Sequence, residues 1–136
     1  MLTDWNSNLE TGHDEIDAQH RKLLEHFQLF SDACRNGKGK QQITELCTFL
    51  ESYVVEHFDS EESLMTRYNY PFITTHRLEH KGFTAKLRHL KYEVVQDRIT
   101  LPLIIETSEN LLRWLLEHIL KTDVQMAEFF RSQTPS

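Results

Sequence analysis

The stretch HFDSEESLMTRYNYPFITTHRLEH, which runs from His57 to His80, decides the fold that the sequence predicts. It contains two pairs of metal-ligand residue types four positions apart: His57 with Glu61, and His76 with His80. Side chains four apart on an α-helix lie on the same face, so each pair can present two donor atoms to one place. Pro71 separates the pairs, and a proline disfavours helix at the preceding residue and readily starts a new helix. We therefore expect two antiparallel helices, joined by a tight turn, with their ligand pairs facing each other.

Length and composition predict a single all-helical domain. The chain has 136 residues, enough to bury an ordinary core without a partner. Only three prolines and four glycines interrupt long segments in which apolar residues recur at helical spacing. We expect an all-α fold, an up-down-up-down four-helix bundle with an N-terminal arm and a short C-terminal helix. One domain would cover residues 1–136, with the arm at 1–13, long helices at about 14–35, 41–67, 72–95 and 101–120, and a short helix at about 124–131.

Charge and cysteine content exclude several classes of function. The chain carries 15 basic and 21 acidic residues, a formal charge of -6, which argues against a nucleic-acid surface or an anionic membrane partner. Cys34 and Cys47 fit no metal or redox spacing, and we interpret them as small buried residues or bystanders. No charged-then-apolar leader or long apolar span is visible, so we expect a cytoplasmic protein.

The first and fourth predicted helices add ligand-type residues to the interior. His20 and His118 both fall in apolar stripes. A glutamate on such a stripe, as at Glu61, must be paired, protonated or bound to metal, because an uncompensated buried carboxylate is too costly. Asp123 follows His118 by five residues, a rotation of roughly 140° on a regular helix, so we expect the helix to end or bend near Lys121. Seven ligand-type side chains would then meet: His20, His57, Glu61, His76, His80, His118 and Asp123.

The three remaining histidines do not share these stripes. His26 is six residues past His20, and His89 is nine past His80, so we expect both to face solvent. His13 would share the face of His20 only if the first helix began early, and we interpret it as a residue of the arm.

Five imidazoles and two carboxylates predict a metal site. A single histidine on an apolar face is usually hydrogen-bonded core, but seven such groups without metal would leave several polar groups unsatisfied, each costing about 1 to 3 kcal/mol. Nitrogen and carboxylate ligands without thiolate suit iron, manganese or zinc, and exclude an iron-sulfur cluster or a thiolate-rich zinc finger. Seven ligands are too many for one ion but suit two octahedral ions bridged by carboxylates.

The sequence resembles the hemerythrin family, and within it the single-domain bacteriohemerythrins. The resemblance covers essentially the whole chain, as one hemerythrin-like domain, although His13 stands where related sequences more often carry an aliphatic residue. The matching segments are Ile16-Asp17-Ala18-Gln19-His20, His57-Phe58 with Glu61-Glu62 and Met65, His76 with His80, and Trp114-Leu115 with His118-Ile119 and Asp123.

The resemblance implies a cofactor of two iron ions (Fe2+/Fe3+) with an oxo or hydroxo bridge. His76, His80 and His118 would hold one iron, and His20 and His57 the other. Glu61 and Asp123 would bridge the two irons, which leaves the second iron open for a ligand. The apolar pocket over the open iron would be formed by Leu23, Phe58, Trp114, Leu115 and Ile119.

The function implied is reversible O2 binding by an oxygen carrier, store or sensor that is not an enzyme. Nitric oxide and peroxide are alternative ligands for the open iron. One competing function is a di-iron oxidase or peroxidase, but ferritin-like sites use mainly carboxylates with a Glu-x-x-His motif on each of two helices, and here that spacing occurs only from Glu10 to His13. The other is a redox-sensing or NO-sensing signalling module, whose output would need a separate, unidentified protein.

Overall fold

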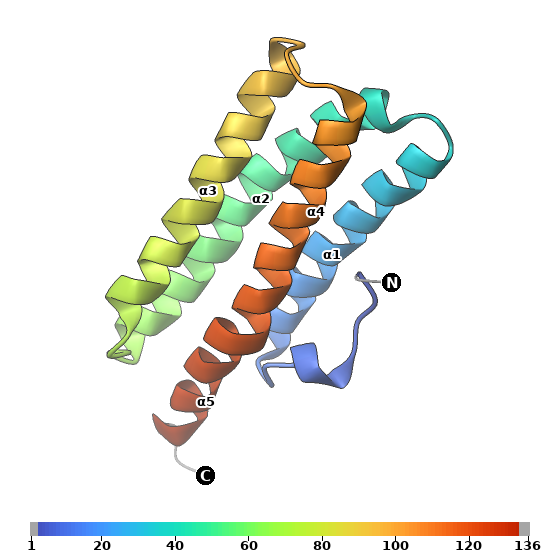
Figure 1. Cartoon of the computed structure of the whole chain (residues 1–136). Coiled ribbons are helices and arrows are strands. Elements are labelled where there is room, and N and C mark those ends of the chain that lie inside the picture. The colour runs from blue at the N-terminus through green and yellow to red at the C-terminus, as the bar shows by residue number, and fades with distance from the viewer. Residues whose placement is uncertain (1–2, 134–136) are drawn as a thin grey trace.

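The computed structural model describes residues 3–133, so positions 1–2 of the predicted arm lie outside the described residues. It confirms the all-α class and the bundle of four antiparallel helices, with an N-terminal arm and a short C-terminal helix (Figure 1). The arm contains a 3-10 turn, η1 (Ser7–Leu9). The helices that follow are α1 (Asp14–Arg35), α2 (Gly39–Arg67), α3 (Ile73–Val95), α4 (Leu101–Glu117), the π-helix η2 (His118–Asp123) and α5 (Val124–Gln133).

Helix α1 begins with a histidine cap and an acidic first turn. Nδ1 of His13 accepts a hydrogen bond from the backbone N–H of Ile16 at 3.3 Å, which satisfies one of the free donors of the first turn. Asp14, Glu15 and Asp17 follow, where negative charge is favourable against the helix dipole. His13 therefore lies at the boundary between the arm and α1, outside the bundle interior.

Asp17 ties the arm to the bundle. Its Oδ1 accepts hydrogen bonds from the backbone N–H of Thr11 at 2.9 Å and from the Thr11 hydroxyl at 2.8 Å. Its Oδ2 accepts a third from the N–H of Gly12, whose φ of +87° is accessible to glycine without strain. Arg131 of α5 donates to the Thr11 carbonyl, so the arm also contacts the C-terminal helix at this side of the bundle.

The turn between α2 and α3 is short, as the proline predicts. The backbone N–H of Tyr70 donates to the carbonyl of Met65 at 2.9 Å, and Asn69 takes the left-handed conformation with φ of +53°. Pro71 follows, and α3 begins at Ile73, one residue after the predicted start. The turn sets the relative height of the ligand pairs on the two helices.

The ligand-type residues lie between two apolar clusters. One cluster runs through the longer part of the bundle and contains Leu23, Phe58 and Ile119; the other contains Ile16 and Met65. On each helix the ligand positions fall between members of the two clusters, as His20 does between Ile16 and Leu23. The polar layer is therefore shielded from water on both sides.

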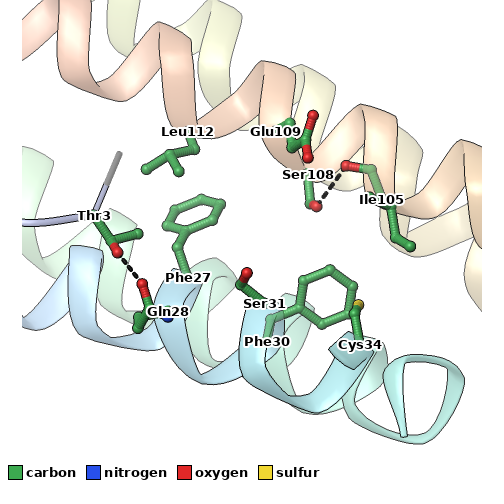
Figure 2. A pocket seen from close by; sticks show the side chains of 10 residues that line it. All are labelled: Thr3, Phe27, Gln28, Phe30, Ser31, Cys34, Ile105, Ser108, Glu109 and Leu112. Carbon is green, nitrogen blue, oxygen red and sulfur yellow. Dashed lines mark hydrogen bonds between the residues drawn. The ribbon is translucent and has the colours of Figure 1, made fainter. Parts of the chain in front are cut away.

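A cavity of about 280 Å³ opens between α1 and α4 (Figure 2). Phe27, Phe30 and Leu112 supply apolar walls, and the Ser108 hydroxyl bonds to the carbonyl of its own helix at Ile105. None of the lining residues belongs to the seven predicted ligands or to the five predicted pocket residues. This cavity is therefore separate from the predicted oxygen site.

The cysteines and the helix lengths complete the description. Cys34 and Cys47 are both free, and burial raises the pKa of the Cys47 thiol to about 11. Within residues 3–133, no helix has the length and apolar character needed to cross a membrane.

Candidate metal centre

The structure brings all seven predicted ligand residues together in the interior of the bundle. Helix α1 contributes His20, α2 and α3 contribute two residues each, and His118 and Asp123 lie at the two ends of η2. None of the seven is more than 3% exposed. They form two groups of side chains whose potential ligand atoms lie within 4.8 Å of one another: Glu61, His76, His80, His118 and Asp123 in the first, and His20, His57, Glu61 and Asp123 in the second.

Glu61 contacts both groups, with one oxygen directed to each. Its Oε1 lies 3.2 Å from Nε2 of His76 and 3.0 Å from Nε2 of His80. Its Oε2 lies 3.0 Å from Nε2 of His57 and 3.4 Å from Nε2 of His20. A carboxylate placed in this way can serve as a ligand shared by two ions.

Asp123 repeats this arrangement from the opposite helix. Its Oδ1 lies 3.1 Å from Nε2 of His76 and 3.1 Å from Nε2 of His118, and its Oδ2 lies 2.9 Å from Nε2 of His20. Both carboxylates therefore lie between a group of three imidazoles and a group of two.

The π-helix η2 explains how His118 and Asp123 reach one site. The sequence predicts an end or a bend near Lys121, but the chain stays helical from Leu101 to Gln133 and widens over His118–Asp123. In a π-helix each backbone N–H bonds to the carbonyl five residues back and each turn holds more residues than in an α-helix, so residues five apart come much closer to sharing one face. The spacing that conflicts with a regular α-helix thereby becomes a shared face.

The unpaired polar atoms in the cluster fit a metal site. Nε2 of His20 lies 2.9 Å from Oδ2 of Asp123, yet neither atom has a hydrogen bond within the described part of the chain. The same is true of Nε2 of His57 and His118 and of Oε2 of Glu61. Buried polar atoms are rarely left without a partner. Here the nitrogen and oxygen atoms lie close together without forming hydrogen bonds, which is the arrangement expected of ligands that share a metal ion. The donor set of imidazole and carboxylate suits iron.

Imidazoles and carboxylates in the cluster shift one another's pKa. Burial lowers the pKa of His20, but the close carboxylates of Asp123 and Glu61 outweigh it and raise that pKa to about 9. The same balance raises the pKa of His76 to about 9. Burial raises the pKa of Glu61, but His57 and the neighbouring imidazoles outweigh it and hold that pKa well below its usual range. Metal binding therefore has to displace protons from histidines.

Three outer contacts were not predicted from the sequence. Nδ1 of His57 lies 2.6 Å from Oε1 of Gln19. Nδ1 of His80 lies 3.2 Å from Oε2 of Glu62, and Nδ1 of His118 lies 2.9 Å from Oε1 of Glu79. Gln19 and Glu62 stand beside predicted ligands within the segments that carry the family resemblance, which is the one signal that could have indicated them.

The five predicted pocket residues lie beside the cluster, and their role stays a prediction. Leu23, Phe58, Leu115 and Ile119 are buried, and Trp114 is half-buried. The Phe58 ring stacks on His80 with centroids 3.8 Å apart, and the Trp114 ring stacks on His118 at 4.8 Å. The two aromatic members thus fix the orientation of two imidazoles.

Two histidines outside the cluster differ from each other. His89 is exposed, as the sequence predicts. The prediction of a solvent-facing His26 is wrong, because this side chain is half-buried and its ring stacks on Phe49 with centroids 3.4 Å apart. A spacing argument places the residue off the ligand stripe but cannot detect an aromatic partner on the next helix.

Comparison with known proteins agrees with this geometry. Residues 11–130 match the family model described as the hemerythrin HHE cation binding domain. The chain belongs to the hemerythrin family. Hemerythrins bind a di-iron centre, and the buried histidine and carboxylate cluster is suited to hold one. This hemerythrin is therefore assigned as a non-haem iron protein.

Sequence similarity to known relatives covers most of this chain. The bacteriohemerythrin of Pseudomonas paraeruginosa is 30% identical over 93% of this chain and 80% of its own length. That of Clostridium acetobutylicum is 30% identical over 88% of this chain and 94% of its own length. A solved crystal structure, described as that of a mutant in which phenylalanine replaces a leucine, shares the fold with a TM-score of 0.80 and 23% identity, covering 92% of this chain and 94% of that one.

Proposed function

We propose that this hemerythrin binds O2 reversibly as a carrier, store or sensor. The observation that carries the proposal is the unequal division of imidazoles around two shared carboxylates. His76, His80 and His118 would hold one iron, and His20 and His57 would hold the other. Glu61 and Asp123 would bridge the two irons, together with an oxo or hydroxo group.

Counting donors gives the two irons different roles. Three nitrogens and three bridging oxygens would complete six positions on the first iron, whereas two nitrogens and the same bridges would leave one position open on the second. An open position is what distinguishes a reactive metal site from a structural one. When bound, the iron pair supplies the two electrons that reversible O2 binding requires.

The side chains beside the cluster would protect the oxygenated form. Leu23, Leu115 and Ile119 are at most 1% exposed, and none of the five predicted pocket residues is a general acid or base. Apolar walls exclude water and protons, which would otherwise promote irreversible oxidation of the irons. The proposed pocket thus favours release of intact O2.

Two observations disfavour a di-iron oxidase or peroxidase. The cluster contains five imidazoles and two carboxylates, whereas ferritin-like enzyme sites are mainly carboxylate. The one Glu-x-x-His spacing in the sequence ends at His13, which caps α1 and lies outside both ligand groups. Hemerythrins are in general oxygen-binding carriers rather than enzymes.

A visible spectrum of the reduced, iron-loaded protein tests the proposal. Protein with two irons per chain is expected to gain a charge-transfer band on contact with O2 and to lose it under vacuum. Zinc-loaded protein is the control, because the same ligands then hold a redox-inactive ion. Irreversible bleaching, or iron below two per chain, would contradict the proposal. Steady consumption of O2 with a reductant, over many turnovers per chain, would favour the enzyme.

A further inference from the structure

We propose that Glu62 and Glu79 are positioning residues that lower the reduction potential of the iron held by three histidines. Each carboxylate accepts a hydrogen bond from the outer nitrogen of one ligand, His80 or His118, and its charge would stabilise the ferric state of that iron. This inference rests on the proposed di-iron function. The two irons would then differ in the hydrogen bonds made by the outer nitrogens of their histidines as well as in the number of those histidines.

The contacts themselves are short and come from different helices. Glu79 on α3 places Oε1 2.9 Å from Nδ1 of His118 on η2, and Glu62 on α2 places Oε2 3.2 Å from Nδ1 of His80 on α3. The Nε2 atoms of both rings point to the ligand cluster. Metal on Nε2 leaves the proton on Nδ1, so each ring then donates to its carboxylate.

Among the described residues, no carboxylate accepts a hydrogen bond from the outer nitrogens of the two-histidine group. Nδ1 of His57 lies 2.6 Å from Oε1 of Gln19, which is a neutral amide. The amide orientation is supported by Nε2 of Gln19, which donates to the Ser60 hydroxyl at 3.4 Å. Nδ1 of His20 has no hydrogen-bond partner among residues 3–133. Both outer carboxylates therefore serve the three-histidine group, and the other group has an amide or nothing.

A charged acceptor and a neutral one affect a ligand differently. Donation to a carboxylate makes the imidazole more basic and a stronger donor to the metal. The side chains of Glu79 and Glu62 are 36% and 27% exposed, so water screens their charges in part, but each charge still interacts with the ion more strongly than it would in bulk water. Both effects favour Fe(III) over Fe(II), so the three-histidine iron would be the easier of the two to oxidise.

The two carboxylates differ in expected strength. Glu62 shares its charge with Arg77, whose Nε lies 3.0 Å from the Glu62 Oε1. Glu79 accepts a hydrogen bond from the neutral hydroxyl of Thr122 at 3.0 Å. The contact of Glu79 with its histidine is also the shorter of the two. We therefore expect the larger effect from Glu79.

Anaerobic redox titration of the full-length, iron-loaded protein tests this inference. Glu79→Gln keeps an oxygen acceptor of the same shape and removes the charge, and should raise the lower of the two one-electron potentials. The loss of an outer partner typically changes metal affinity by about 10-fold or more. A tenfold loss confined to Fe(III) corresponds to about 59 mV for one electron. Glu62→Gln should give a smaller rise, and Gln19→Glu should lower the other potential.

The matched control is Glu117→Gln. Glu117 lines the same surface hollow as Glu79, but its carboxylate accepts from Lys121 at 2.8 Å and belongs to neither ligand group. A shift in Glu79→Gln no larger than in this control would overturn the inference. Loss of iron from Glu79→Gln without a shift in potential would also overturn it, because Glu79 would then only hold the ring.

Failure of the inference can be separated from failure of the proposed function. Reversible O2 binding is measured on the unaltered protein, whereas the potentials require only bound iron. Shifted potentials in a protein that does not release O2 would leave the inference standing and remove the proposed function. Unshifted potentials in a protein that binds O2 reversibly would remove the inference alone.

Discussion

Replacement of Glu61 by glutamine should disable the metal centre without creating a cavity. Glu61 is fully buried, and its two oxygens lie within 3.4 Å of four imidazole nitrogens. Glutamine has the same shape but is neutral, and its amide nitrogen is a poor metal ligand. One shared carboxylate would then remain, that of Asp123, and we expect fewer than two irons per chain.

The stability cost can be worked out from the charges in the metal-free protein. The pKa of Glu61 is held low and the pKa values of His20 and His76 are raised to about 9, so the glutamate is ionised and balances protonated imidazoles. Removing one partner of a buried ion pair costs about 3 to 5 kcal/mol. For a chain of this length we therefore expect the melting temperature of the metal-free protein to fall by roughly 10 to 20 °C.

The assay combines iron analysis with thermal unfolding followed by circular dichroism. Glu56→Gln is the matched control, because Glu56 lies on the same helix as Glu61 but is exposed. Its backbone carbonyl accepts a hydrogen bond from the Ser60 hydroxyl, and the substitution leaves that bond unchanged. This control should keep two irons and an unchanged melting temperature. The reasoning is refuted if Glu61→Gln also binds two irons, or if its metal-free form is as stable as the control.

Further predictions concern the pocket, the pH dependence and the arm. Leu115→Ala and Leu87→Ala should each lower the free energy of unfolding by about 2 to 5 kcal/mol, since both side chains are 1% exposed. Visible spectra should show that only Leu115→Ala shortens the lifetime of the oxygenated form; equal lifetimes would contradict the pocket. The pKa values of His20 and His76 are raised above 6.5, so their stabilisation of the metal-free protein is present below pH 6.5 and lost as the pH rises through about 9. Between these pH values the melting temperature of the metal-free protein should fall as the pH rises, whereas that of the iron-loaded protein should not. A melting temperature of the metal-free protein that does not change with pH would contradict this prediction. Asp17→Asn should destabilise the protein by about 1.5 to 3 kcal/mol by weakening three hydrogen bonds, while iron analysis still finds two irons; lost iron would give Asp17 a larger role.

The helices and the inward position of the histidines and carboxylates could be predicted because they depend on local spacing. His57 with Glu61, and His76 with His80, are four residues apart, and the period of the α-helix alone places each pair on one face. The proline at position 71 gives the direction change between them. A buried glutamate beside histidines then indicates a metal site, and this inference does not require the packing between helices to be known.

The outer contacts could not be predicted because they depend on the register between helices. Glu79 reaches His118 from a different helix, and the two are 39 residues apart in the sequence. The other glutamates of α3 and α4 would have been equal candidates from the sequence: Glu93, Glu106, Glu109 and Glu117. The stacking of His26 on Phe49 was missed for the same reason, since neither residue indicates the other along its own helix.

The π-helix also affects how such sites can be found by sequence pattern. A search for a histidine followed four positions later by a carboxylate finds His57 with Glu61 and misses His118 with Asp123. The wider turns of η2 accommodate one residue more than a regular helix does while both side chains still point inward. A chain with one residue fewer between His118 and Asp123 would have the four-residue spacing in a regular α-helix. Patterns for paired ligands on helices should therefore accept both spacings.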